Sequence, residues 1–251
     1  VRLAGLIALD EAFHEDVRAE AARKALVGLI SEPRGAPLAE LLAAAERWPH
    51  ASFKQPVISA LKRDLSAEET IRGVAVLRRL MPPSTRDAWG DTLDRFWSRM
   101  AKGEVPLVTR DEKLGTLDLL AVDQPGPDTV VVLGRLMRDE HTEVRAEAHR
   151  VLTMIGAGLL WFGWYGFNVG SIVFSGSTEE EIVAQFVSET GVTFLNTTMA
   201  TMAAIIGWLV VERLLHGKAT SLGAASGIVA GLVAITPACG AVDLEGAIAI
   251  G

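Results

Sequence analysis

Three long stretches without a charged side chain constrain what the second half of this chain can fold into. They cover residues 154–178, 190–211 and 219–242, which is 25, 22 and 24 residues. About 20 mostly apolar residues in a helix cross the hydrocarbon core of a bilayer. A buried helix of a soluble protein would rarely stay uncharged for this long three times over. We therefore expect three membrane spans, followed by the start of a fourth, at about residues 154–176, 190–211 and 219–238.

The charged residues divide the chain into two parts. Residues 1–153 hold 22 of the 24 Lys and Arg residues and 24 of the 31 Asp and Glu residues. Residues 154–251 hold the remaining two cations and seven acids, so the net charges of the parts are −2 and −5. We expect a soluble segment over 1–153 and a membrane segment over 154–251. Neither part has the basic excess that favours nucleic acid, so no nucleic-acid partner is expected.

The orientation of the spans follows from the few charges between them. Residues 179–189 form an expected acidic loop without Lys or Arg, whereas residues 212–218 form an expected short loop with Arg213, His216 and Lys218. Cytoplasmic loops of membrane proteins carry the excess of Lys and Arg. The sequence therefore predicts a multi-pass membrane protein whose loop 212–218 is cytoplasmic.

The first part predicts one helix after another. Clear copies of a pattern lie at residues 16–26 and 139–152, in which Val-Arg is followed by a small residue and an aliphatic pair at helical spacing. Prolines between the patterns end or start helices. Ser66, with Glu69 three residues later, predicts a capped helix start, and Ser84-Thr85 and Thr142 are further expected starts.

This pattern resembles HEAT-type repeats over about residues 1–152. The resemblance implies an all-α solenoid that offers a surface to an unknown protein partner and carries out no chemistry itself. The histidines support the absence of chemistry: His141 and His149 are eight residues apart, too far along a helix to share one metal. The single cysteine, Cys239, allows no intrachain disulfide. We expect no enzyme, no catalytic residue, no metal ligand and no cofactor.

The uncharged runs contain motifs in a specific order. Residues 163–171 read Gly-Trp-Tyr-Gly-Phe-Asn-Val-Gly-Ser, and Asn196-Thr197 and Glu212 follow. Residues 221–240 begin Ser-Leu-Gly-Ala-Ala-Ser-Gly and end Thr-Pro-Ala-Cys-Gly. From about residue 155 to 251 this order and spacing resemble the sixth to eighth spans, and the start of the ninth, of the ammonium transporter (Amt) family. The resemblance implies transport of ammonium or ammonia across a membrane.

The resemblance also implies roles for single residues. Phe167 matches one of two stacked phenylalanines that gate the pore, and Ser171 matches a hydroxyl that helps to bind ammonium in the outer vestibule. Trp164 matches an aromatic residue that lines the conduction path, and Ser226 matches a polar residue near the inner vestibule. These roles are physically coherent, because aromatic faces attract a small cation and an apolar constriction admits a neutral molecule better than an ion.

Other parts that the family uses have no counterpart in the sequence. Family members conduct past two histidines on other spans, and none of the five histidines here lies in an uncharged run. We therefore expect the isolated chain not to conduct. The family also implies a homotrimer and a PII-type regulator. Two alternatives stay open: a helical-repeat scaffold tethered to the membrane, and a truncated or chimeric gene product, which the start at Val1 and the apolar end at residues 247–251 favour.

Overall fold

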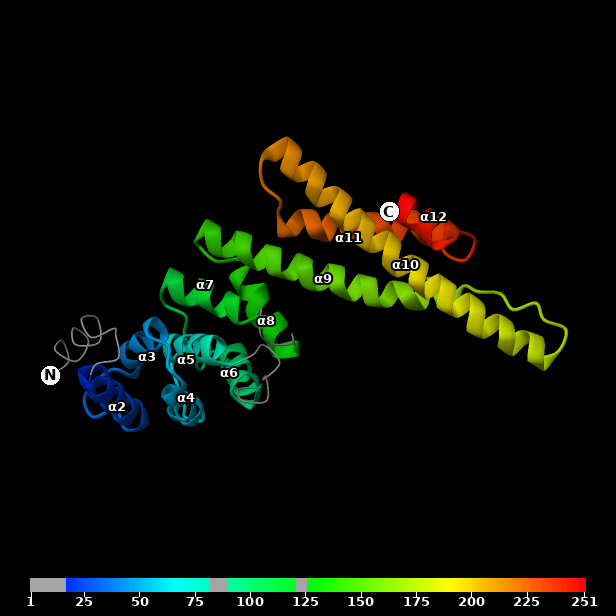
Figure 1. Ribbon diagram of the computed structural model, residues 1–251. Coiled ribbons are helices and arrows are strands. Elements are labelled where there is room, and N and C mark those ends of the chain that lie inside the picture. The colour runs from blue at the N-terminus through cyan, green and yellow to red at the C-terminus, as the bar shows by residue number, and fades with distance from the viewer. Residues whose placement is uncertain (1–16, 82–89, 121–125) are drawn as a thin grey trace. The chain divides into compact units, whose positions relative to one another are not determined.

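The computed structural model describes residues 17–81, 90–120 and 126–251, and within these ranges it contains helices and no strand (Figure 1). This confirms the predicted all-α fold. The chain divides into two compact units, residues 1–148 and residues 149–251. Helix α9 (Thr142–Gly170) belongs to both units, because it continues without a break across the boundary between them.

The first unit is built from short helices that alternate between two layers. They are α2 (Val17–Ser31), α3 (Leu38–Arg47), η1 (Ala51–Phe53), α4 (Lys54–Leu61), α5 (Ala67–Leu80), α6 (Gly90–Lys102), α7 (Arg110–Leu119), α8 (Pro127–Leu136) and the start of α9. Helix α3 packs on α5 and α5 on α7, while α2 packs on α4 and α6 on α8. Such alternation is the layout of an α-solenoid. The resemblance to HEAT repeats in particular stays a prediction.

Five arginines link segments of the first unit to earlier ones. Each guanidinium donates a hydrogen bond to a main-chain oxygen at or just beyond the C-terminal end of an earlier helix, 32 to 35 residues before it. The pairs are Arg63 with Ser31, Arg79 with Glu46, Arg95 with Lys62, Arg99 with Leu65 and Arg135 with Met100. Carbonyls at helix C-termini lack partners inside the helix. Most of these arginines satisfy carbonyls of this kind and so link helices that are about 33 residues apart in the chain.

The predicted helix starts that fall on described residues are confirmed. Ser66 precedes α5, its hydroxyl accepts from the Glu69 backbone at 3.3 Å, and its own N–H donates to the Glu69 carboxylate at 2.9 Å, which completes the capping box. Thr142 begins α9 as expected. The expected start at Ser84-Thr85 lies outside the described residues.

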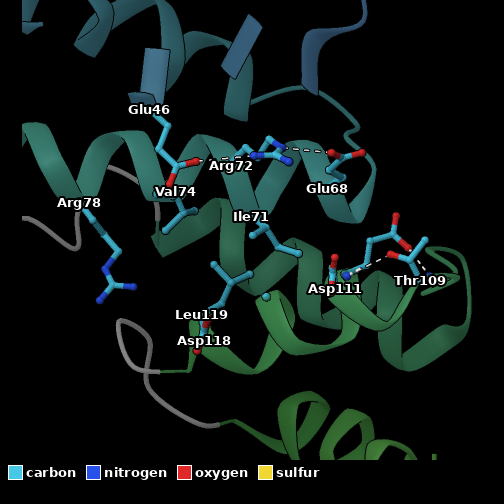
Figure 2. Close-up of a pocket in the computed structure, with 13 residues that line it drawn as sticks. Glu46, Glu68, Ile71, Arg72, Val74, Arg78, Thr109, Asp111, Asp118 and Leu119 are labelled. Atoms are coloured by element: carbon cyan, nitrogen blue, oxygen red, sulfur yellow. Dashed lines mark hydrogen bonds and ion pairs between the residues drawn. The ribbon is translucent and has the colours of Figure 1, made fainter. Parts of the chain in front are cut away.

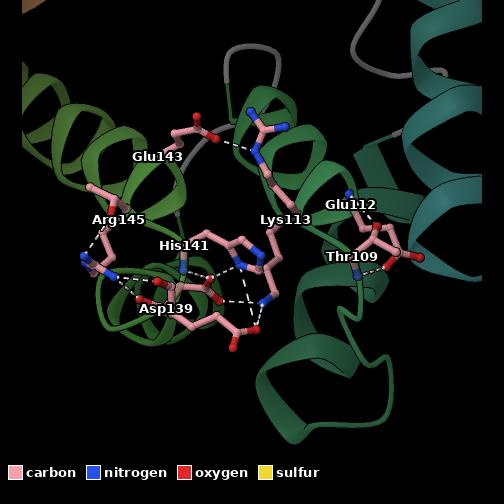
Figure 3. Close-up of polar contacts among 10 residues, drawn as sticks. Thr109, Glu112, Lys113, Asp139, His141, Glu143 and Arg145 are labelled. Atoms are coloured by element: carbon pink, nitrogen blue, oxygen red, sulfur yellow. Dashed lines mark hydrogen bonds and ion pairs between the residues drawn. The ribbon is translucent and has the colours of Figure 1, made fainter.

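A buried ion pair holds the loop between α8 and α9 against α7 (Figure 3). The Lys113 ammonium on α7 lies 2.8 Å from the Asp139 carboxylate, and their side chains are 9% and 10% exposed. The other Asp139 oxygen accepts from the backbone N–H of His141 and contacts its ring Nδ1, both at 2.9 Å. Burial alone would raise the pKa of Asp139, but these hydrogen bonds outweigh it and lower the pKa to about 2.

The lowered pKa of Asp139 predicts a loss of stability in acid. A carboxyl whose pKa is lower in the folded state stabilises that state above its ordinary pKa of about 4, and the contribution disappears as pH falls through the folded value. We expect the stability difference between the natural chain and Asp139→Asn to be constant above about pH 5 and to shrink between about pH 4 and pH 2. Urea unfolding at a series of pH values measures it, and a difference that does not change in acid would contradict the assignment.

The second unit contains the later part of α9 and three further helices, α10 (Glu179–His216), α11 (Ser221–Ile235) and α12 (Leu244–Ile250), with the short η3 (Thr236–Ala238) after α11. Two described helices are long and apolar enough to cross a membrane, α10 and the stretch Ser221–Ala238. They contain the second and third predicted spans, 190–211 and 219–238, apart from the first two residues of the third. The expected start of a fourth span is the short helix α12.

The predicted first span, 154–176, is wrong at its end, because α9 stops at Gly170. The uncharged part of α9 carries Asn168 and five glycines, which lower its hydropathy, and α9 is not one of the two helices that pass as candidate spans. Glycine also weakens the helix by about 1 kcal/mol relative to alanine. The Ser171 hydroxyl then donates to the Asn168 carbonyl at 2.8 Å, which satisfies one group at the helix end.

The predicted acidic loop 179–189 is also wrong, since these residues form the first turns of α10. Thr178 accepts from the backbone of Glu181, and the Glu181 side chain accepts from the backbone of Thr178, so a capping box starts the helix here. Acidic side chains in a first turn also favour a helix through its dipole. The three glutamates therefore begin a helix of 38 residues, longer than the span that the uncharged run predicted.

The predicted loop 212–218 is shorter than expected. Helix α10 continues to His216, and Gly217 ends it with φ of 77°, a conformation that glycine adopts at little cost. Glu212, on the last turn of α10, accepts from the backbone N–H and the hydroxyl of Thr220 at 2.9 and 2.7 Å. Thr220 in turn caps α11. Glu212 therefore fastens the end of α10 to the start of α11, and the cytoplasmic position of this connection stays a prediction.

Helices α10 and α11 pack on each other (Figure 1), and glycines lie at their contact. A Cβ on Gly227 would lie 2.8 Å from the Ile205 Cα, and one on Gly231 would lie 2.7 Å from the Thr201 Cα. Only glycine allows the two backbones to come this close, as expected for a pair of glycines four residues apart in a membrane helix.

Candidate functional site

Trp164 lies on α9 and reaches across to the end of α11. Its indole Nε1 donates to the Thr236 hydroxyl at 2.8 Å. Its ring packs, together with Trp161, on the buried cluster that contains Ile228 and Leu232 of α11. A buried indole N–H needs an acceptor, and Thr236 supplies one. Trp164 is therefore held in a fixed orientation by packing and by one hydrogen bond.

Phe167 lies one turn after Trp164 and is exposed over 61% of its surface. The centroids of the two rings are 5.6 Å apart and the ring planes are inclined by 54°. On the neighbouring side of α9, Tyr165 stacks on Phe194 of α10 with centroids 4.3 Å apart, and its hydroxyl lies 3.0 Å from the Thr198 hydroxyl. The contacts of Trp164 and Tyr165 orient this part of α9, so Phe167 projects from a constrained backbone.

Ser171 directly follows the last residue of α9 and is exposed. Its hydroxyl proton goes to the Asn168 carbonyl at 2.8 Å, which leaves the lone pairs of the oxygen for another donor. An oxygen presented in this way can accept from a cation or from water. Trp164, Phe167 and Ser171 thus follow one another at the C-terminal end of one helix.

Ser226 does not lie with the other three predicted site residues. Its neighbours Ala225 and Ile228 face the cluster shared with α9, whereas Ser226 is exposed and lines a different pocket of about 720 Å³. This pocket is formed by the end of α10 and the start of α11, and Trp208 and Glu212 also line it. The Ser226 hydroxyl donates to the Leu222 carbonyl at 3.0 Å.

The sequence reasoning assigned no role to several buried polar residues of the second unit. Asn168 donates to the Thr197 hydroxyl at 3.0 Å, and Asn196 donates to the main-chain oxygens of Cys239 and Val242 at 3.0 and 2.7 Å. Asparagine inside an uncharged run is itself a signal, because a polar side chain at this depth has to find a partner. That signal could have identified Asn168 and Asn196 as contacts between helices.

The first unit carries a separate groove over α5 and α7 (Figure 2). It encloses about 560 Å³. Arg72 lies in it between two acids, 3.1 Å from Glu68 and 3.8 Å from Glu46. Asp111 and Asp118, both on α7, line the same groove and are exposed. The groove is thus polar at its rim, and its apolar lining includes Ile71 and Leu119.

Metal ligands do not gather in the part of the chain that the structure describes: no group of three or more His, Cys, Asp or Glu side chains is placed to hold an ion there. Cys239 is buried and its thiol donates to the Thr236 carbonyl at 3.3 Å. The absence of cofactor and metal stays a prediction of the sequence.

Comparison with known proteins shows that the second part of the chain is similar to a family of transporters. Residues 129–251 match the model of the Ammonium Transporter Family. The ammonium transporter of Mycobacterium tuberculosis is 59% identical over 98 residues, which is 39% of this chain and 18% of the relative. The ammonium transporter of Aquifex aeolicus is 50% identical over 100 residues, 40% of this chain and 21% of the relative. Ammonium transporter Amt1 of Archaeoglobus fulgidus is 45% identical over 113 residues, 43% and 25%.

These matches confirm the resemblance predicted for residues 155–251, and the family match begins earlier, within α8. The chain spans about a fifth of the length of the curated relatives that it matches. All three relatives are named ammonium transporters, and the expected absence of catalysis stays a prediction.

Proposed function

We propose that the second part of this chain serves the transport of ammonium or ammonia across a membrane, as a set of middle spans of a transporter. The observation that carries this proposal is the 59% identity over 98 residues to a protein named ammonium transporter. The family match over residues 129–251 supports it, because that range contains the whole second unit. The two helices long and apolar enough to cross a bilayer support a membrane location.

The proposed roles of the residues on α9 follow from their chemistry. Ser171 offers oxygen lone pairs to an ammonium ion in the outer vestibule, and the face of Trp164 adds cation–π attraction of about 1–2 kcal/mol. Phe167 is one half of an apolar gate that favours neutral ammonia over the ion. The exposed ring of Phe167 supports this, since a gate residue needs a free face toward the conduction path. Ser226 contributes a polar group on the inner side, from the pocket that it shares with Trp208 and Glu212.

The isolated chain is proposed not to conduct. A conduction path needs a closed wall, and this chain covers about a fifth of its relatives. Large apolar side chains on the second unit, among them Phe162 and Leu214, are exposed over 78% and 79% of their surface. In a complete transporter such side chains would meet lipid or further spans. The connection near residues 212–218 is proposed to be cytoplasmic, and a homotrimer and a PII-type regulator are proposed for the complete assembly only.

A chimeric transporter tests the function of the segment. Residues 155–251 would replace the corresponding segment of the Mycobacterium tuberculosis ammonium transporter, and methylammonium uptake would be measured in transport-deficient cells. We expect uptake comparable to that of the parent. In the chimera, Phe167→Ala and Ser171→Ala are expected to lower uptake by a factor of about 10 or more, because each removes a contact worth about 1.4 kcal/mol to the moving substrate.

Phe162→Ala is the matched control in this chimera. Phe162 is an exposed aromatic residue of the same helix and has no proposed role. Its replacement is expected to leave uptake within a factor of about two of the unchanged chimera. A chimera that reaches the membrane but takes up no methylammonium would contradict the proposed function. Uptake by vesicles that contain only the isolated chain would contradict the proposal that this chain alone does not conduct.

A second candidate function concerns the first unit. Its groove over α5 and α7 favours the role of a protein-binding scaffold tethered by the membrane helices, since solenoids bind partners along such surfaces. The two proposals are separable, because the chimera contains no part of this groove. Uptake by the chimera therefore tests the second part of the chain only, and the scaffold role concerns the first unit only.

A further inference from the structure

A network of buried polar side chains links α9 to α10 in the second unit. Asn168 is 1% exposed and its Nδ2 donates to the Thr197 hydroxyl at 3.0 Å. Thr197 is fully buried, and its own hydroxyl proton goes to the Thr193 carbonyl at 2.7 Å. Because that proton is already used, Thr197 can only accept from the Asn168 side chain. The amide nitrogen of Asn168 therefore faces Thr197, and its oxygen faces away.

Within this polar network, two side-chain atoms lack a hydrogen-bond partner in the described part of the molecule. They are the Asn168 Oδ1 and the Thr193 Oγ1, and Thr193 is fully buried. Other threonines of α10, such as Thr201, return their hydroxyl to the carbonyl four residues earlier, but Thr193 does not. A buried polar group without a partner costs about 1–3 kcal/mol, and water cannot reach it freely in a membrane. A bound molecule would remove that cost.

The two unpaired atoms belong to residues that hydrogen bonds connect through Thr197. Thr193 and Thr197 are one helical turn apart and lie on the same buried face of α10. Asn168 reaches this face through Thr197, whose hydroxyl also contacts the Thr193 carbonyl. On another side of Thr193, Gly240 has no side chain, and a Cβ there would lie 3.4 Å from the Thr193 hydroxyl oxygen.

We propose that Asn168 Oδ1 and Thr193 Oγ1 form a buried site for one small neutral hydrogen-bond donor, which is water or ammonia. The amide oxygen can only accept, so the occupant has to donate, whereas the hydroxyl can accept from the occupant or donate to it. The described partners of Asn168, Thr193 and Thr197 are neutral groups. An ion without a counter-charge would cost far more here than a neutral molecule. The site does not depend on the proposed transport function.

The direction in which one substitution changes the stability tests the proposal. Thr193→Val removes the hydroxyl and keeps the shape. If the hydroxyl binds an occupant, the variant loses that bond and is expected to unfold at a temperature about 2–4 °C lower. If the hydroxyl is dry, removing it relieves an unsatisfied group and stability stays the same or rises, which would overturn the proposal. The readout is alkylation of Cys239, the single cysteine, which is buried in the second unit of the full chain.

Coupling to Asn168 gives the second measurement. Asn168→Leu and Thr193→Val are combined in a double-mutant cycle. If both residues bind the same molecule, the double variant loses clearly less stability than the two single variants lose in total. Thr201→Val is the matched control, because Thr201 is equally buried on the same face but its hydroxyl is satisfied by Thr197. The control is expected to add to Asn168→Leu without coupling, and strict additivity for Thr193→Val would overturn the proposal.

Salt composition separates the two possible occupants. The unfolding temperature is compared in ammonium chloride and potassium chloride at equal ionic strength and at a pH where part of the ammonium is deprotonated. Equal temperatures, together with the coupling, assign the site to water. A higher temperature in ammonium chloride for the natural chain, absent from Thr193→Val, assigns it to ammonia, since a ligand stabilises only the form that binds it.

Discussion

Replacing Gly231 with alanine is expected to destabilise the second unit by about 1–3 kcal/mol, although alanine is the better helix former. A Cβ at this position would lie 2.7 Å from the Thr201 Cα, 2.7 Å from the Ala204 Cβ and 3.0 Å from the Ala200 oxygen. Two of these three atoms belong to the backbone of α10, so no side-chain rotation can make room. The helices have to move apart, and that separation weakens every other contact between α10 and α11.

Leucine at the same position is expected to have a still larger effect, because it fills the whole region where the helices meet. Gly207→Ala is the matched control. Gly207 lies inside α10, as Gly231 lies inside α11, and no described atom beyond its own turn lies within 4 Å of an added Cβ. The control should stabilise by up to about 1 kcal/mol through helix propensity alone.

The rate at which Cys239 becomes alkylated in increasing denaturant measures both glycine variants in the full chain. Cys239 packs on Ala200 and Ile235, so it reports on the same pair of helices. Equal effects of alanine at Gly231 and Gly207 would show that the close approach of α10 and α11 contributes nothing to stability.

Removing the Asp139 carboxylate is expected to destabilise the first unit by about 3 kcal/mol or more. In the natural chain the Lys113 side chain is only 9% exposed, and its other acidic neighbour, Glu140, lies 3.6 Å away. Asp139→Ala removes the nearer partner of this ammonium. A buried charge that has lost its partner costs much more than the pair contributed. The loop between α8 and α9 also loses the two contacts of Asp139 with His141.

The double variant Lys113→Met/Asp139→Leu is expected to recover most of this stability, because apolar residues of similar size replace buried ion pairs at little cost. Glu32→Ala is the control, since its pair with Arg34 is exposed over 71% and 85% of the side chains and should contribute less than about 1 kcal/mol. Urea unfolding followed by far-ultraviolet circular dichroism measures all three. A double variant as unstable as Asp139→Ala would mean that the loop contacts, and not the unpaired ammonium, account for the loss.

Much of the second unit could be read from the chain because the signals are local. Uncharged runs predicted the central parts of α10 and α11. The close contact between these helices at Gly227 and Gly231 came from the structure. The ends were less accurate. The capping box at Thr178 and Glu181 moved the start of α10 before the uncharged run, and α9 stopped at Gly170 inside its own run. Hydropathy identifies the segment that is apolar enough to lie in a bilayer, but caps and glycines determine where a helix begins and ends.

The grouping of the site residues depended on the fold. Motif resemblance selected Trp164, Phe167, Ser171 and Ser226 together. In the structure Trp164 and Phe167 lie on α9 and Ser171 directly follows it, whereas Ser226 lies on α11. The hydrogen bond from Trp164 to Thr236 joins residues 72 positions apart, and the one from Asn168 to Thr197 joins residues 29 apart. No spacing rule within one helix predicts such pairs.

The sequence alone determined the helical class, the division by charge and the resemblance of the second part to ammonium transporters, because hydropathy, charge and motif order are properties of consecutive residues. The tertiary structure decided which polar groups meet: the arginines that reach back 32 to 35 residues, the Lys113–Asp139 pair, and the buried Asn168 with its unpaired oxygen. These contacts depend on how helices pack. Packing is a joint result of many apolar contacts that no single stretch of the chain contains.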